Sequence, residues 1–197
     1  NNSSYHLTIG SNLEDLYQRS KRFYKRFSKL CCKPIAIVEL GNHQIFIQDF
    51  FEGKPLDECY LDSTISENEI KLIIDEIATA FSRNEKNSSI DKMEDEVESF
   101  ISNLDKNKFL SDSDKIFLCE NFKYELRAFY KDNIPSLRLS TGDFIARNIL
   151  VAKDKSFKLI DLEFSCETHF HQEDWIRFSQ FCHDDFKKIE IIDEIKS

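Results

Sequence analysis

Three oxygen-bearing side chains lie beside short apolar runs in the last third of the sequence. Asp143 and Asn148 belong to one polar segment, 141–148, and Asp161 follows the apolar run 157–160. Phosphoryl transfer needs a carboxylate that orients the attacking hydroxyl and accepts its proton. It also needs a second carboxylate and an amide oxygen that hold Mg²⁺ against the nucleotide phosphates. Oxygen ligands suit this hard cation, so these residue types and their spacing indicate phosphoryl transfer.

The elements that precede this segment begin with a helix and a β-hairpin. Residues 11–31 place their apolar residues on one helical stripe, and Ser11 followed by Glu14 is typical of a capping box at the start of a helix. The β-rich runs 35–40 and 43–50 flank a Gly-Asn pair, which favours a tight hairpin. The first part of the chain is therefore predicted to be a small sheet with one amphipathic helix.

From Ser66 onward the pattern becomes helical. Ser66 and Glu69 form a second capping-box pattern, which opens an apolar stripe that runs to Phe81. Pro135 stops a later helix. Further helices are predicted at 91–104, 112–131 and from about residue 173, with short strands at 137–139, 148–152 and 157–160. The order predicts an α/β fold in which a small sheet lobe precedes a helical lobe.

The polar loop with its flanking strands resembles the catalytic loop of kinase-like phosphotransferases, most closely the aminoglycoside phosphotransferase and choline kinase type. The matching motif is GD-x4-N, followed by an apolar strand and Ile-Asp-Leu-Glu-Phe. Gly142 precedes the Asp, as in that subgroup, where protein kinases have Arg. The resemblance implies ATP and Mg²⁺ as cofactors, Asp143 as the catalytic base, and Asn148 and Asp161 as metal ligands.

Two further segments extend the resemblance to about residues 35–180. Residues 46–56 are similar to the segment that joins the two lobes in these enzymes, which implies that adenine lies against the backbone of Gln48, Asp49 and Phe50. Asp174 stands where the family carries an Asp that accepts hydrogen bonds from the backbone of the catalytic loop. The implied division is a remnant of the small lobe at 1–48, a hinge at 49–56 and a helical lobe at 57–197.

Several polar residues near the motif have more than one interpretation. Arg147 either steadies a phosphate or pairs with a neighbouring carboxylate, and Glu163 is either an acid that faces the metal or a surface residue. His169 and His171 lie near acidic residues, but their spacing is not that of a zinc site. We expect the two histidines to belong to a loop on the substrate side.

The sequence departs from the family pattern in the segment before the hinge, which binds the nucleotide phosphates in these enzymes. Before the hinge there is no Gly-rich loop and no strand Lys to bind the α- and β-phosphates, and Thr141 stands where His is usual. Either an upstream segment lies outside this chain, as the first residue not being Met suggests, or a shortened lobe binds the nucleotide differently. Glu14 either pairs with such a Lys or serves only the capping box.

Composition excludes some partners. The net charge of −9 argues against nucleic acid, because nucleic-acid binders need clustered Lys and Arg. No apolar stretch is long enough to span a membrane. The six Cys form no CxxC pattern and are expected to be free thiols in a reducing compartment. We therefore expect a cytoplasmic protein.

Together these features predict a phosphotransferase that moves the γ-phosphate of ATP to a hydroxyl of a small molecule, a sugar or a glycan. The alternative is a nucleotide-binding pseudokinase or scaffold module that the missing Lys leaves inactive. A protein kinase would carry a longer segment between Asp161 and Asp174 than this chain has. The sequence does not identify the acceptor.

Overall fold

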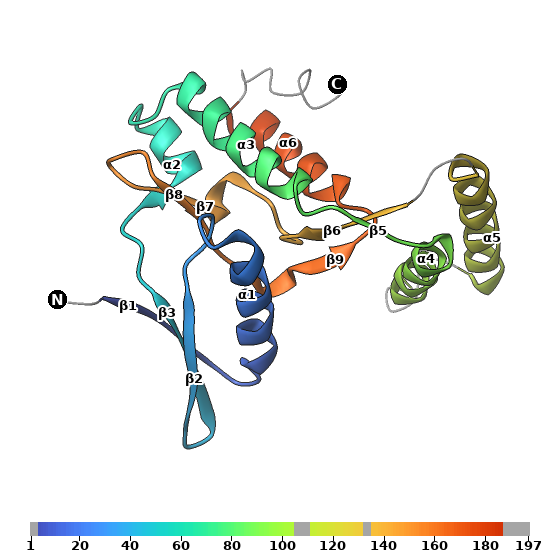
Figure 1. Cartoon of the computed structure of the whole chain (residues 1–197), viewed down its shortest axis with the longest axis horizontal. Helices are drawn as coiled ribbons and strands as arrows, with labels where there is room; N and C mark the ends of the chain where they lie inside the picture. The colour runs from blue at the N-terminus through green and yellow to red at the C-terminus, as the bar shows by residue number, and fades with distance from the viewer. Residues whose placement is uncertain (1–3, 105–110, 132–134, 187–197) are drawn as a thin grey trace. The chain divides into compact units, whose positions relative to one another are not determined.

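The computed structural model describes residues 4–104, 111–131 and 135–186. The chain divides into two compact units. The first unit comprises Asn1–Asn84, Leu139–Cys166 and His171–Ser197, and the second comprises Glu85–Arg138 and Glu167–Phe170. Figure 1 labels their helices and strands. Among the described residues, no helix is long and apolar enough to cross a membrane.

A three-stranded antiparallel sheet opens the first unit (Figure 1). Its strands are β1 (Tyr5–Gly10), β3 (His43–Asp49) and β2 (Pro34–Leu40), in that order. The predicted hairpin of β2 and β3 is confirmed, with Leu40 opposite His43 and Gly41 at a φ of 61° between them. Strand β1 was not predicted from the sequence, because its six residues form a strand only by pairing with β3.

Helix α1 (Glu14–Phe27) is present, but the capping box predicted at its start is wrong. The helix begins at Glu14, with Leu13 at the cap position and no side-chain cap. The N–H of Leu13 instead donates to Oε1 of Gln44, 2.6 Å away on β3. Glu14 is exposed and accepts a hydrogen bond from Gln18 within the helix. A contact with the sheet, rather than Ser11, therefore decides where this helix starts.

The remaining elements of the first unit surround one aromatic core. Helix α3 (Glu67–Ser82) has the predicted capping box of Ser66 and Glu69, and its apolar stripe is buried. The sheet of β4 (Lys54–Pro55), β7 (Ile149–Val151) and β8 (Phe157–Leu159) is antiparallel, and α2 (Leu56–Leu61) follows β4 directly. The core includes the rings of Phe23, Phe27, Phe81, Phe144 and Phe178, with Trp175 packed against it.

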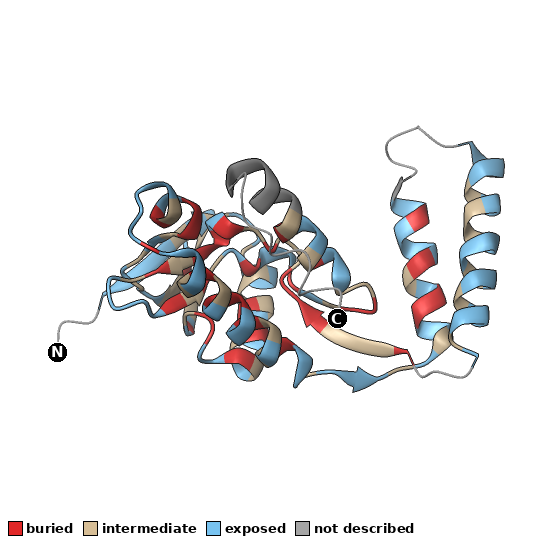
Figure 2. Ribbon diagram, turned by 90° about the horizontal axis from the view of Figure 1, so that it is seen from above, coloured by how far each residue is buried: buried red, intermediate tan, exposed pale blue. Residues whose placement is uncertain are grey.

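The second unit is mainly a pair of helices, α4 (Ile90–Leu104) and α5 (Asp112–Phe129), both close to the predicted ranges. Helix α4 buries Met93, Val97 and Ile101, whereas α5 has no buried residue (Figure 2). Strand β5 (Lys86–Asn87) pairs with β6 (Ser136–Ser140) in the third sheet, which also contains β9 (Cys166–Thr168). The last described element is helix α6 (Gln172–Phe186), which belongs to the first unit. It begins within one residue of the helix start predicted at about residue 173.

Candidate functional site

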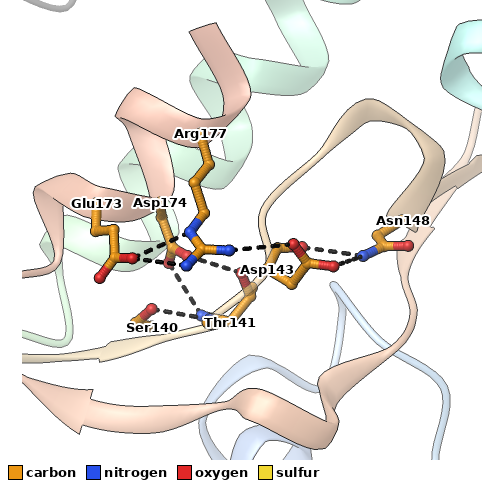
Figure 3. Close-up of polar contacts among 8 residues, drawn as sticks. Ser140, Thr141, Asp143, Asn148, Glu173, Asp174 and Arg177 are labelled. Atoms are coloured by element: carbon orange, nitrogen blue, oxygen red, sulfur yellow. Dashed lines mark hydrogen bonds and ion pairs between the residues drawn. The ribbon is translucent and has the colours of Figure 1, made fainter. Parts of the chain in front are cut away.

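The loop that carries Asp143 is anchored at its start by Asp174, on the first turn of α6. Asp174 is 2% exposed, and its carboxylate accepts hydrogen bonds of 3.0 Å from both the backbone N–H and the hydroxyl of Thr141 (Figure 3). Burial raises the pKa of Asp174, while hydrogen bonds from residues 140–142 oppose that shift. The hydroxyl of Thr141 thus supplies a second bond from the loop to this buried carboxylate.

Gly142 is required by the close approach of another backbone segment. Its φ is 76°, and a Cβ built on it would lie 2.4 Å from the carbonyl oxygen of Phe164. No side chain fits at that distance, and the left-handed conformation itself favours glycine. The Gly before Asp143 therefore allows the loop to pack against the 3₁₀ turn Leu162–Phe164, which directly follows Asp161.

Asp143 and Asn148 contact each other directly (Figure 3). Nδ2 of Asn148 donates to the carbonyl oxygen of Asp143 at 3.0 Å and to its Oδ2 at 3.2 Å. These bonds use the donor side of the amide, and Oδ1 of Asn148 accepts no hydrogen bond from the described residues. The backbone carbonyl of Asn148 also accepts the N–H of Ile160 at 2.9 Å, which ties the loop to the residue before Asp161.

Asp161 occupies a left-handed backbone conformation, with φ 57° and ψ 55°. Partial desolvation, and secondly the charge of Asp143, raise the pKa of its carboxyl group. Both causes disfavour the ionised form, and a divalent cation bound beside Asp161 would offset them. Asp161 and Oδ1 of Asn148 form an oxygen donor set that suits Mg²⁺. The described residues contain no group of three or more His, Cys, Asp or Glu arranged for a metal ion.

A pocket of about 440 Å³ lies within the first unit beside Asp161. Its lining includes all three residues predicted to contact adenine, Gln48, Asp49 and Phe50. The N–H groups of Asp49 and Phe50 are already used, since they donate to the carbonyls of Lys33 and Ser4. Residues 51–53 also line the pocket, and their N–H groups make no backbone hydrogen bond within the described chain.

The supporting residues divide between the pocket and other contacts. Glu163 is exposed and lines the pocket together with Asp161. Arg147 pairs with a carboxylate, which is one of the two roles considered for it. Its Nε lies 3.3 Å from Oδ2 of the largely buried Asp57 on α2. In the second unit, Nδ1 of His169 lies 2.6 Å from a carboxylate oxygen of Glu96.

Arg177 is a residue of this site that sequence reasoning missed. Its Nη1 lies 3.7 Å from Oδ1 of Asp143, on the carboxylate oxygen that Asn148 does not contact (Figure 3). Its Nε and Nη2 donate to Oε1 of Glu173 at 3.1 and 2.7 Å. The signal available in the sequence was the i, i+4 pair of Glu173 and Arg177 on the helix that carries Asp174.

The fold of this chain resembles that of a solved structure. The chain resembles the crystal structure of an aminoglycoside-3'-phosphotransferase of type VIII with a TM-score of 0.53 and 12% sequence identity, over 93% of this chain and 72% of that chain. At this identity the likeness shows the fold alone, which is protein-kinase-like. No family model and no curated protein matches the sequence. The predicted mixed α/β fold is confirmed, and its similarity to a kinase-like fold supports the prediction. The truncated sheet lobe, the helical lobe and the hinge at residues 49–56 stay predictions.

Proposed function

We propose that this chain is a phosphotransferase that moves the γ-phosphate of ATP to a hydroxyl group of a small molecule, a sugar or a glycan. The observation that carries the proposal is the contact of Asp143 with Asn148, together with the effect of the charge of Asp143 on Asp161. Asp161 lines the pocket, whereas Asp143 and Asn148 are not among its described lining residues. The similarity in fold to a phosphotransferase supports the same reaction class. The bonds from Thr141 to Asp174 hold the start of the loop, which keeps Asp143 in place.

Asp143 is assigned the role of general base. An acceptor hydroxyl beside its carboxylate loses its proton to Asp143 as the hydroxyl oxygen bonds to the γ-phosphorus. The bond from that phosphorus to the β,γ-bridging oxygen breaks, and ADP leaves. The site is held for this step by two contacts: Asn148 fixes Oδ2 of Asp143, and Arg177 lies beside Oδ1.

Asn148, through its Oδ1, and Asp161, through its carboxylate, would hold Mg²⁺. Glu163 lines the pocket and would supply a further carboxylate near the ion. When bound, the ion would supply positive charge to the nucleotide phosphates. The donors are oxygen atoms, as a hard cation requires. Asp161 and Glu163 both line the pocket, so the charge of a bound ion would lie beside the phosphates of a nucleotide bound there.

The purine is assigned to the other end of the pocket, where β3 leads into the segment 50–53. Because the N–H groups of Asp49 and Phe50 are engaged elsewhere, their carbonyls and the N–H groups of 51–53 are the backbone atoms offered to adenine. Gln48, Asp49 and Phe50 thus remain lining residues of the nucleotide site in this proposal. Their side chains add packing around the base rather than specific donors.

A nucleotide-binding module without phosphotransfer activity is the second candidate. One observation favours it: no Lys or Arg is found among the described residues that line the pocket. Kinases use such a cation to position the phosphates. The two candidates differ in one respect. A binding module does not need a carboxylate aligned as a base, whereas the carboxylate of Asp143 is contacted by Asn148 at the end of the loop and by Arg177 on α6.

The experiment that separates them is ATP consumption with Mg²⁺ across a panel of amino alcohols, aminoglycosides and sugars. Asp143→Asn should lower turnover by about 10²–10⁴-fold and leave ATP affinity unchanged, because only the proton acceptor is lost. Asp75→Asn, an exposed carboxylate on α3, serves as the matched control and should behave like the wild type. ATP binding without turnover of any acceptor would favour the binding module, and equal turnover by Asp143→Asn would remove Asp143 from its assigned role.

A further inference from the structure

The sheet of β1, β3 and β2 (Figure 1) has an inner face and an outer face. Phe46 of β3 marks the inner face, because it is buried, lines the pocket and has its ring against Tyr17 of α1. Thr8 of β1 lies opposite Phe46 in the antiparallel pairing and lines the pocket as well. Opposite residues of paired strands point to the same face and successive residues to opposite faces, so the pairing assigns the side chains of the sheet to one face or the other.

The outer face is apolar across all three strands. Its large exposed side chains are Tyr5, Leu7 and Ile9 on β1 and Val38 and Leu40 on β2. Ile45 and Ile47 of the central strand β3 lie between them, and Ile45 is paired with both Ile9 and Val38. The five side chains on the outer strands are between 45% and 66% exposed. The outer face, made of these seven residues, is therefore one continuous apolar surface that solvent reaches.

Polar residues are distributed over the two faces in the reverse of the usual way. An antiparallel sheet with one covered face normally carries its polar residues on the face toward solvent. Here Gln44, Gln48 and Thr8 are on the inner face, whereas the outward positions between the strand ends hold aliphatic residues. Exposed apolar patches of several hundred Å² mark interaction sites. The pattern of these strands therefore indicates that a second surface covers the outer face.

We propose that the outer face is the interface with a second copy of this chain, packed sheet on sheet about a two-fold axis. The five exposed side chains present about 500 Å² of apolar surface, so two copies would bury about 1,000 Å² before the backbone and the rim are added. An interface of this size is large enough to be specific. The inference is independent of the proposed function, because the seven side chains of the outer face do not line the pocket.

Charge favours a second copy as the occupant. The seven residues of the outer face include no Asp, Glu, Lys or Arg, whereas the whole chain has a net charge of −9. Two copies repel each other over most of their surfaces, and the repulsion is smallest where the facing patches are uncharged. A partner selected by charge would need ion-pairing groups on this face. A two-fold axis instead places the same apolar patch on both sides, so each patch meets a surface of matching chemistry.

Analytical ultracentrifugation of the whole chain, over about 1–100 µM, measures the association directly. We expect a monomer–dimer equilibrium with a dissociation constant in the micromolar range, as for a small interface. A monomer at all concentrations would overturn the proposal. Open-ended association would overturn it as well, because a two-fold interface closes at the dimer. A monomer that floats with neutral phosphatidylcholine vesicles would assign the outer face to a lipid surface instead.

Leu7→Lys and Val38→Lys place an ammonium on the outer face. Both side chains are about half exposed in the single chain, so the variants should fold, but the dimer would bury the charge among apolar side chains. We expect each to raise the dimer dissociation constant at least about tenfold. Leu72→Lys on α3 and Phe117→Lys on α5 are the matched controls, since both residues are large, apolar and exposed elsewhere, and they should dimerise like the wild type.

Unchanged dimerisation of the folded outer-face variants, or loss of the dimer in either control, would overturn the proposal. Circular dichroism shows which variants fold. Hydrogen–deuterium exchange of the wild type at both ends of the concentration range needs no variant. Slower exchange in β1 and β2 at high concentration is expected, and slowing confined to α5, or none, would overturn the assignment of the dimer to the outer face.

Discussion

The two units of this chain differ in how their residues are used. In the first unit, the loop 141–148 lies over an aromatic core, and Phe144, next to Asp143, is 1% exposed. In the second unit, helix α5 is 18 residues long and buries none of them. Hydrophobic burial is thus concentrated under the residues proposed to do chemistry, which is where a fixed geometry has the most effect.

The helix pair shows the opposite arrangement of apolar residues. Helix α4 buries a single row, whereas large apolar side chains of α5 are exposed at Ile116, Phe117, Phe122, Tyr124 and Phe129. Regions with few buried contacts open locally at low free-energy cost. The comparison therefore indicates that substitutions will matter strongly near the loop and weakly on α5.

The largest expected effect comes from Phe144→Ala. Phe144 contacts Phe81, Trp175 and Phe178, so its removal leaves a cavity and should destabilise the first unit by about 3–5 kcal/mol. Trp175 is the one Trp of the chain, and its fluorescence during urea unfolding reports on this unit. Phe117→Ala, on the exposed face of α5, should change stability by less than about 0.5 kcal/mol. Equal effects would break the comparison.

Gly142→Ala should have the next largest effect. A Cβ would meet the backbone of Phe164 at 2.4 Å and the residue would keep a positive φ, so we expect a loss of more than about 2 kcal/mol. Gly41→Ala is the matched control, because Gly41 has a φ of 61° but nothing within 4 Å of the added Cβ. It should show only the conformational strain, about 1 kcal/mol. A similar cost at both positions would mean that the loop tolerates displacement.

Arg127→Met tests how much one ion pair stabilises the second unit. Arg127 donates two hydrogen bonds, of 2.5 and 2.8 Å, to the carboxylate of Glu94, which is largely buried. The pair lowers the pKa of Glu94, so its stabilisation is present at neutral pH and is lost as the pH falls through the folded-state pKa. We expect the helix pair to melt a few degrees lower at neutral pH by circular dichroism, with a smaller difference at acidic pH.

The Trp175 transition is the control for Arg127→Met. The substituted pair lies in the second unit, and Trp175 packs in the first. An unchanged transition is expected if each unit is stabilised mainly by its own contacts. A parallel loss in both signals would show that the units unfold together.

The smallest effect is expected for Asp161→Asn, and it should be a gain. The pKa of Asp161 is raised, so its ionised form costs stability at pH values above the folded-state pKa, and this cost is absent below the unfolded pKa. Asn removes the charge and tolerates the left-handed backbone at this position. The melting temperature should rise by about 1–3 °C at neutral pH and match the wild type in acid.

Mg²⁺ supplies the control for Asp161→Asn. If Asp161 binds the ion, added MgCl₂ should raise the melting temperature of the wild type more than that of the variant. A variant that is less stable than the wild type at neutral pH would contradict the unfavourable interaction of Asp161 with Asp143.

Much of the fold was predictable because it depends on local chemistry. The capping box of Ser66 and Glu69 and the hairpin at Gly41 need only neighbouring residues, and both were found where the sequence places them. Strand β1 and the first residue of α1 were not predictable in this way. Each depends on β3: the strand on pairing with it, and the helix start on the bond from Leu13 to Gln44.

By itself, the sequence determined the set of residue types in the loop and their spacing, since GD-x4-N and the later Asp are properties of chain order. Only the tertiary structure decided which groups meet them. Arg177 reaches Asp143 because Asp174, three residues earlier on α6, is bonded to the start of the loop, and Arg147 turns to Asp57 instead. Such contacts join residues far apart in the chain, and spacing along a sequence does not show which side chains meet across these distances. Of these contacts, the resemblance implied only the one between the loop and Asp174.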